Sequence, residues 1–253
     1  MTGRYYKKSV ELHEKSRGKL EVCSKVPLNN MEDLSTAYTP GVAEVSRRIA
    51  KNKDLAYRYT MKSNTVAIVT DGSAVLGLGN IGGLAAIPVM EGKAILFKKF
   101  AGIDAFPICF DETHPDFIDD IRSIAPVFGG INLEDIAAPK CFEVEDALQG
   151  IGIPVMHDDQ HGTAIVVLAA LLNAARVTEK MFEDLTVVIS GAGAAGFAIT
   201  KMLDCIGIDK DICTKVKKVF VCDTKGIIYR GRKDLLGIKH KYIISQETNH
   251  GKK

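Results

Sequence analysis

The residues best suited to chemistry with a nucleotide form a glycine-rich turn between a predicted strand and a predicted helix. The apolar run 185–190 predicts a buried strand, and a G-x-G-x-x-G motif follows it at once. Gly191 can make the tight turn, Gly193 lets the backbone approach a pyrophosphate, and Gly196 lets the helix pack close to the strand. The free N–H groups at the helix start attract phosphate. We therefore expect the cofactor to contact Gly191, Ala192, Gly193, Ala194, Ala195 and Gly196.

An acidic residue ends the next predicted strand. Residues 219–222 are apolar and lead into Asp223. A carboxylate at this point can accept a hydrogen bond from an adenosine ribose hydroxyl, so the whole pattern predicts a site for NAD or NADP. Asp223 favours NAD because it repels a 2′-phosphate, but nearby Lys225 offsets that repulsion and leaves the preference open. The alternative is a glycine-rich turn that binds no ligand.

Two acidic pairs point to a second kind of chemistry. Glu134 and Asp135 follow a glycine turn, and Asp158 and Asp159 follow the predicted strand 153–156. Open α/β sheets bind ligands just beyond such strand ends. Carboxylates from two strand ends can converge on one hard cation, and an all-oxygen site suits Mg²⁺ or Mn²⁺. The alternatives for each pair are a helix N-cap and a solvated turn.

A lysine and a tyrosine are candidates for acid–base chemistry. Lys93 lies inside the apolar segment 91–97, where burial or a neighbouring cation would lower its pKa and make it a candidate base. Tyr38 comes just before the turn made by Pro40 and Gly41. The alternatives are a surface lysine and a tyrosine that packs against apolar neighbours.

A second G-x-G-x-x-G motif occurs at residues 77–82. The predicted strand before it ends at Thr70, several residues too early, and no strand ending in an acid follows at a suitable distance. We therefore expect a loop whose backbone lines a pocket, with a second nucleotide site as the alternative.

These residues need a framework of alternating strands and helices to position them. Apolar and periodic runs predict an α/β fold with a largely parallel sheet, preceded by about 60 mainly helical residues. The expected strands are 66–70, 105–110, 153–156, 185–190 and 219–223, and the expected helices are 5–17, 43–59, 115–124, 140–149, 163–177 and 197–203.

Composition narrows the class of protein. The chain has 253 residues, of which 33 are Lys or Arg and 31 are Asp or Glu, and this balance argues against a protein that binds nucleic acid or a membrane surface. The longest apolar stretch, 164–172, is too short to span a bilayer, and the polar N-terminus does not resemble a signal peptide. The six cysteines show no zinc-ligand spacing, so we expect small core residues in a reducing compartment, the cytoplasm.

Taken together, the motifs resemble those of the malic enzymes, in particular the small bacterial and archaeal type. The resemblance runs through about residues 35–230 in the order of the family. The matching stretches are 37–43, 69–82, 91–94, 100–104, 132–136, 157–164, 191–196 and 222–226.

The resemblance implies oxidative decarboxylation of L-malate to pyruvate and CO₂, with reduction of NAD⁺ or NADP⁺. By matching position, Glu134, Asp135 and Asp159 would hold Mg²⁺ or Mn²⁺, and Asp158 would support the site from beside it. The family also implies a homodimer. An arginine that binds a substrate carboxylate in larger members aligns with Ala74, so another group must bind that carboxylate.

Two catalytic roles come from the same resemblance. Lys93 would be the general base that takes the proton of the C2 hydroxyl while hydride leaves for the nicotinamide. Tyr38 would be the general acid that protonates the enol after CO₂ departs. A base is needed first and an acid later, which requires two groups with separated pKa values.

The implied organisation is an N-terminal α/β domain for substrate and metal, residues 1–160, followed by a Rossmann-type dinucleotide domain, residues 161–253. We expect this second domain to be C-terminally incomplete, because such a sheet needs further strands after Asp223. Two alternatives to the malic-enzyme reaction remain. One is a malolactic-type conversion of malate to lactate, and the other is a non-catalytic remnant that binds a ligand or a partner.

Overall fold

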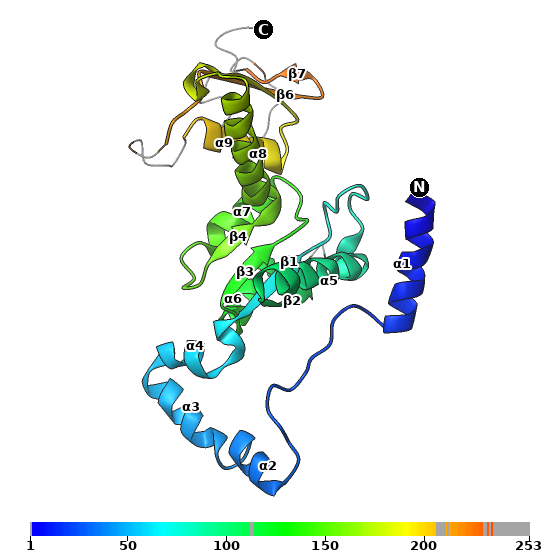
Figure 1. The fold of residues 1–253 in the computed structure, drawn as a ribbon, viewed down its shortest axis with the longest axis vertical. Helices are drawn as coiled ribbons and strands as arrows, with labels where there is room; N and C mark the ends of the chain where they lie inside the picture. Colours follow the sequence, from blue (N-terminus) through cyan, green and yellow to red (C-terminus); the bar gives the residue numbers. More distant parts are fainter. Residues whose placement is uncertain are drawn as a thin grey trace. The chain divides into compact units, whose positions relative to one another are not determined.

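The computed structural model describes residues 2–111, 114–205, 211, 213–229, 232 and 234. The described chain divides into two compact units. Unit 1 comprises residues 1–72, 78–132 and 150–154, and unit 2 comprises residues 73–77, 133–149 and 155–253. Helices and parallel strands alternate in both units (Figure 1), so the predicted α/β fold is confirmed. The predicted domain boundary at residue 160 stays a prediction.

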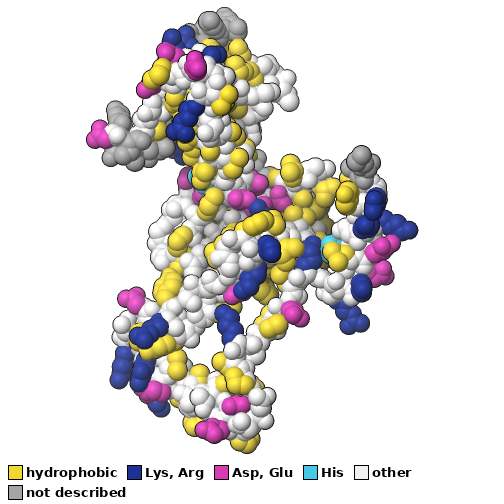
Figure 2. All heavy atoms as spheres, viewed as in Figure 1, with side chains coloured by type: hydrophobic (Ala, Val, Ile, Leu, Met, Phe, Trp, Pro, Cys, Tyr) yellow, Lys and Arg dark blue, Asp and Glu magenta, His cyan; other side chains and the backbone are white. Residues whose placement is uncertain are grey.

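Unit 1 begins with a helical region that has little core of its own. It contains α1 (Thr2–Ser16), α2 (Met31–Ala37), α3 (Val42–Lys51) and α4 (Ala56–Tyr59), and neither α2, α3 nor α4 has a buried residue. Figure 2 shows hydrophobic side chains at the surface over α2 to α4, beside Lys and Arg. The single helix predicted at 43–59 was wrong. Asn52 ends α3 in an extended conformation and caps the next turn by accepting from Asp54 N–H.

The hydrophobic core of unit 1 forms where α5 packs on two parallel strands. β1 (Thr65–Thr70) pairs with β2 (Asp104–Cys109), with Thr65 opposite Asp104, and α5 (Gly82–Ala101) lies against both strands (Figure 1). Met90 and Ala94 lie one helical turn apart and bury themselves against Ile68. This packing fixes the segment of α5 that carries Lys93.

The remainder of unit 1 extends the sheet and covers it. α6 (Phe117–Ile124) buries Phe117 and Ile121, and a short 3₁₀ turn, Ala125–Val127, follows. β3 (Gly130–Leu133) is buried at every position and stands next to β1 in the strand order β2-β1-β3. Its last residue, Leu133, leads directly into Glu134.

The described part of unit 2 contains three packed α-helices. α7 (Lys140–Leu148) precedes β4 (Val155–His157), which runs without a break into α8 (Asp158–Val177), and α8 packs along α9 (Ala194–Leu203). The rings of Phe142 on α7 and Phe197 on α9 lie 4.7 Å apart between centroids. The helix predicted at 163–177 therefore exists but begins five residues earlier, at Asp158.

A second sheet, of order β5-β6-β7, completes unit 2. β5 (Thr186–Ser190) pairs in parallel with β6 (Lys218–Asp223), and β7 (Gly226–Ile227) pairs antiparallel with the end of β6. The chain passes from β5 through the glycine motif into α9 and returns in β6. This is the strand–turn–helix–strand unit that the sequence predicted.

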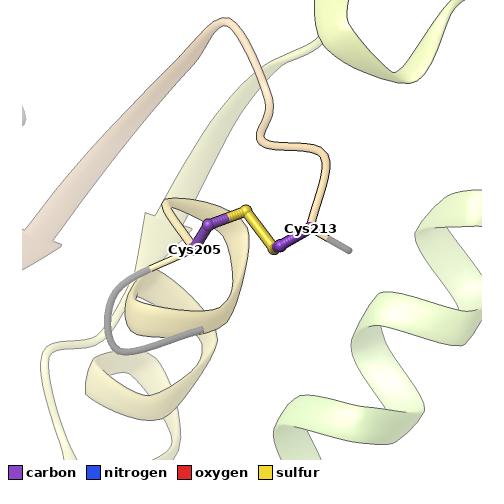
Figure 3. The surroundings of a disulfide bond; sticks show 2 residues. All are labelled: Cys205 and Cys213. Atoms are coloured by element: carbon purple, nitrogen blue, oxygen red, sulfur yellow. A yellow bond between two sulfur atoms is a disulfide. The ribbon is translucent and has the colours of Figure 1, made fainter. Parts of the chain in front are cut away.

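The cysteines do not all behave as predicted. Cys205 and Cys213 form a disulfide (Figure 3), because the chain returns to the end of α9, where Val216 N–H donates to Leu203 O. Cys23 is exposed, which also contradicts a core position. Cys141 is buried as expected, and burial raises its pKa to about 12.

Among the described residues, one helix is long and apolar enough to cross a membrane. α8 is long and apolar enough by length and composition, a test that core helices of soluble proteins also pass. Its first turn carries Asp158 and Asp159, and its side packs on α9. One such helix is weak evidence, and the absence of a membrane segment stays a prediction.

Gly191 and Gly196, the first and last residues of the glycine motif, each exclude a side chain, for different steric reasons. Gly191 has a φ of +121°, which a residue with a side chain rarely adopts. A Cβ at Gly196 would lie 1.9 Å from the carbonyl oxygen of Gly191, so α9 could not approach the turn. At Gly193, where φ is −82°, a Cβ would meet nothing within 4 Å.

This contrast gives a first prediction. Gly196→Ala forces a backbone shift. We expect it to lower the free energy of unfolding by about 1–3 kcal/mol, the usual cost of overpacking a core. Gly193→Ala is the matched control and should leave stability close to wild type. Urea unfolding followed by circular dichroism measures both, and equal stability of the two variants would contradict the packing role of Gly196.

A carboxylate cluster and a glycine-rich turn

Three carboxylates of unit 2 converge. One ligand atom from each of Glu134, Asp135 and Asp159 lies within 4.8 Å of the other two. Glu134 and Asp135 are buried directly after β3, and Asp159 is half-buried in the first turn of α8. The structure therefore brings together the residues that the sequence predicted as metal ligands, from segments 24 positions apart.

The backbone around Asp135 is fixed from two directions. Asp135 N–H donates to Asp159 Oδ2 over 3.1 Å, and its carbonyl accepts from Ala74 N–H over 2.9 Å. Ser73 Oγ accepts from Ala137 N–H over 2.8 Å. Asp135 itself has a φ of +53°, in the left-handed region that Asp tolerates better than most residues. The first contact joins the two ligand-bearing segments, and the contacts with Ala74 and Ser73 fix the backbone of the Asp135 segment.

Asp158 lies beside the cluster rather than in it. A Cβ at Gly162 would come within 2.5 Å of Asp158 Oδ1, so the glycine leaves room for this carboxylate along α8. Asp158 is half-buried. Its predicted role as a supporting residue stays a prediction.

Glu145 on α7 binds the first turn of α8 at three points. Its Oε1 accepts from His157 N–H over 3.2 Å and from His161 Nε2 over 2.7 Å, and its Oε2 accepts from Gln160 Nε2 over 3.1 Å. Glu145 is buried, and its hydrogen bond raises the pKa of His161. Nothing in the sequence marked Glu145, because one acidic residue on an amphipathic helix has no distinctive pattern.

His157 is the most deeply buried polar residue of this turn. Its ring is fully buried, and neither ring nitrogen has a hydrogen-bond partner in the described structure. Burial lowers the pKa of His157, so the ring is neutral near pH 7.

The glycine motif leaves the start of α9 open. Gly193 is the N-cap residue, and no side chain caps the helix. Gly191 N–H donates to Cys222 O over 2.9 Å, which ties the turn to β6. The N–H groups of Ala194 and Ala195 therefore stand at a helix start whose partial positive charge favours phosphate.

Asp223 ends β6 in an ion pair that the sequence did not reveal. Arg232 Nη1 and Nη2 donate to the two oxygens of Asp223 over 2.8 and 2.9 Å, and the same guanidinium binds Asp234. Arg232 holds the pKa of Asp223 below its usual range. The Arg232 side chain is 7% exposed. Only the folding of β7 back along β6 identifies this partner, nine positions away in the sequence.

The two candidate acid–base residues belong to unit 1. Lys93 is half-buried on α5 beside Ala94 of the core. Tyr38 ends α2, and its side chain is 67% exposed. Within unit 1, Lys93 sits in the packed core region and Tyr38 in the helical region without a core, and their catalytic roles stay predictions.

The geometry thus defines an α/β protein with a dinucleotide-type turn and an all-carboxylate cluster. Two family models match it: one described as "Malic enzyme, N-terminal domain" at residues 17–120, and one as "Malic enzyme, NAD binding domain" at residues 160–253. The chain belongs to the malic enzyme family.

Relatives and solved structures agree with this assignment. The chain is 50% identical over 248 residues to the bifunctional malic/malolactic enzyme of Bacillus subtilis, covering 97% of this chain and 58% of that protein. It is 52% identical over 217 residues to the NADP-dependent malic enzyme of Escherichia coli, covering 85% and 28%. The crystal structure of the NAD-dependent malic enzyme of Thermotoga maritima matches with a TM-score of 0.87 and 49% identity, covering 94% and 62%. The chain thus spans less than two thirds of the length of these proteins.

The Asp223–Arg232 pair gives a prediction of pH dependence. Because the folded pKa of Asp223 is lowered, its stabilisation is complete above the unfolded pKa, about 3.9, and is lost as the pH falls through the folded value. We expect Asp223→Asn to lower the free energy of unfolding at pH 7 by about 1–3 kcal/mol, as for hydrogen bonds between charged groups.

The measurement is urea unfolding of wild type and variant from pH 7 to pH 3. The difference between them should hold above a pH of about 3.9 and begin to shrink as the pH falls below that value. Asp184→Asn is the control, because its ion pair with Lys217 is exposed and 4.0 Å long. A gap that stays constant with pH would contradict the ion-pair account.

Proposed function

We propose that this protein oxidatively decarboxylates L-malate to pyruvate and CO₂ with reduction of NAD⁺ or NADP⁺. The observation that carries the proposal is the convergence of Glu134, Asp135 and Asp159 within 4.8 Å, in the same unit as the glycine turn at 191–196. A hydroxy acid that is first oxidised and then decarboxylated needs both a hydride acceptor and a cation. The family membership supports this pairing.

The donor set fits a hard divalent cation. All three groups offer carboxylate oxygens, which suit Mg²⁺ or Mn²⁺ far better than softer metals. Two of the three are buried, and a cation would offset the repulsion between them. When bound, such an ion polarises a substrate carbonyl and stabilises enolate charge.

Two side chains of unit 1 carry out the proton transfers in this proposal. Lys93 takes the proton of the C2 hydroxyl while hydride leaves for the cofactor, and Tyr38 later protonates the enol carbon. The half-buried position of Lys93 on the packed part of α5 supports a base whose position is fixed. Asp158 supports the metal site from the neighbouring position on α8.

The glycine turn and Asp223 bind the dinucleotide. The pyrophosphate would contact Gly191, Ala192, Gly193, Ala194, Ala195 and Gly196 at the N-terminus of α9, and Asp223 would accept a hydrogen bond from the adenosine ribose. Arg232 places positive charge next to Asp223, which reduces the repulsion of a 2′-phosphate. Lys225 contacts Asp223 only through its backbone N–H, and its Nζ pairs with Asp234. Both NAD and NADP are therefore candidates, and relatives are named for each.

A second candidate reaction is the malolactic conversion, in which the nucleotide is retained and lactate is released. The name of the Bacillus subtilis relative, a bifunctional malic/malolactic enzyme, favours it. Lactate in the product mixture would identify this reaction, and pyruvate with reduced nicotinamide would identify the first.

We also propose that the protein forms a homodimer in the cytoplasm and binds neither nucleic acid nor a membrane. Exposed apolar side chains over α2 to α4, including Met31, Tyr38 and Tyr57, support a second copy as a partner (Figure 2). Light scattering coupled to size-exclusion chromatography tests the dimer, and a monomeric mass would overturn it.

The reaction makes a direct prediction about Lys93. The 253-residue chain, given L-malate, Mn²⁺ and NAD⁺ or NADP⁺ in turn, should produce reduced nicotinamide and pyruvate. Lys93→Ala should lower kcat by a factor of about 10²–10⁴, as expected for the loss of a general base, without changing the circular dichroism spectrum. Lys99→Ala, also on α5, is the control. A folded wild-type chain without turnover would favour a non-catalytic remnant.

Metal removal gives a further prediction. Excess chelator should abolish turnover, and added Mn²⁺ or Mg²⁺ should restore it, because the three carboxylates alone cannot stabilise enolate charge. Asp159→Ala should be inactive at any metal concentration that saturates the wild type. Full activity in chelator would remove the metal from the proposal.

A further inference from the structure

We infer that Glu145 is the positioning residue of the metal site, fixing the start of α8 so that Asp159 points at Glu134 and Asp135. This inference rests on the metal site proposed above. Glu145 itself is not part of the three-carboxylate cluster. It acts through residues 157, 160 and 161, which flank Asp159 on both sides.

The start of α8 needs an external anchor. Its N-cap residue, His157, makes no side-chain cap hydrogen bond. In a common arrangement, a Glu or Gln at the third helical position accepts from the N–H of the N-cap residue. Gln160 occupies that position but donates its amide N–H to Glu145 instead. Glu145 takes over the missing acceptor role, because its Oε1 receives the N–H of His157.

The two oxygens of the Glu145 carboxylate have enough acceptor positions for all of their donors. The carboxylate receives three N–H groups: one from the backbone, one from an amide and one from the His161 ring. All three come from residues within two positions of Asp159, so their fixation leaves the helix start little freedom to rotate. Asp159 Oδ2 then accepts from Asp135 N–H, which closes the connection to the other ligands.

The helix that carries Glu145, α7, is held in place by packing. α7 buries Cys141, Phe142, Val144 and Leu148, and Phe142 packs on Phe197 of α9. α7 also begins a few residues after Asp135, so the same packed helix follows one ligand segment and holds the other. A buried side chain on a fixed helix can transmit position, whereas an exposed one could move with solvent.

Direct binding of Mn²⁺ to the full 253-residue chain tests the role. Electron paramagnetic resonance of free Mn²⁺ gives the dissociation constant without any need for turnover. Glu145→Ala should raise this constant about 10–100-fold, the usual cost of losing a partner that orients metal ligands. Glu145→Gln should stay close to wild type, because Gln160 can turn its amide and pair with the new side chain. Glu143→Ala, an exposed change on the same helix, should change nothing.

Three results would overturn the inference. Glu145→Ala could bind Mn²⁺ as tightly as wild type, or Glu145→Gln could bind as weakly as Glu145→Ala, or Glu143→Ala could weaken binding equally. Wild type that binds no Mn²⁺ would instead overturn the metal site itself, and the inference with it. Tight wild-type binding with an unaffected Glu145→Ala overturns the inference alone.

A variant at a partly exposed position guards against loss of folding. His161→Ala removes one of the three hydrogen bonds, and its side chain is 43% exposed, so the fold should tolerate it. If Glu145→Ala does not fold, His161→Ala should still weaken Mn²⁺ binding by a smaller factor. Unchanged binding in folded His161→Ala would then overturn the inference. Thermal unfolding of every variant separates a shifted metal affinity from a loss of overall stability.

Discussion

Carboxylates repel one another, so three of them within 4.8 Å require a rigid backbone that holds them against this repulsion. At an effective dielectric constant of about 20, each pair at that distance repels by roughly 3 kcal/mol. The hydrogen bonds around Asp135 and the contact from Asp135 N–H to Asp159 keep the three groups together.

Unit 2 also contains the glycine turn, where backbone N–H groups at the start of α9 favour a negatively charged ligand. A pyrophosphate needs free N–H groups and a close backbone, and the open start of α9 provides them. Gly196 allows α9 to lie against the turn, and Arg232 fixes the carboxylate of Asp223 at the end of β6. Asp159 of the cluster lies on α8 and the glycine turn leads into α9, and these two helices pack along each other.

Much of this arrangement could be predicted from the sequence. The glycine motif, its strands and the acidic residue after β6 are all local patterns, and each was confirmed as an element. The predicted ligands Glu134, Asp135 and Asp159 also come together, and the hydrogen bond from Asp135 N–H to Asp159 Oδ2 joins their two segments. The start of α8, the break after α3 and the disulfide were not predicted, because each depends on one specific contact rather than on a repeated pattern.

The sequence by itself determined the fold class, the glycine motif and the acidic residues that the fold brings together. Residue type and spacing are enough for this, because hydrophobic period and turn residues act over a few neighbouring positions. Only the tertiary structure decided that Glu145 anchors α8 and that Arg232 neutralises Asp223. Those pairings depend on where α7 packs and where β7 folds back, and an isolated charge in a sequence does not reveal which opposite group the folded chain will place beside it.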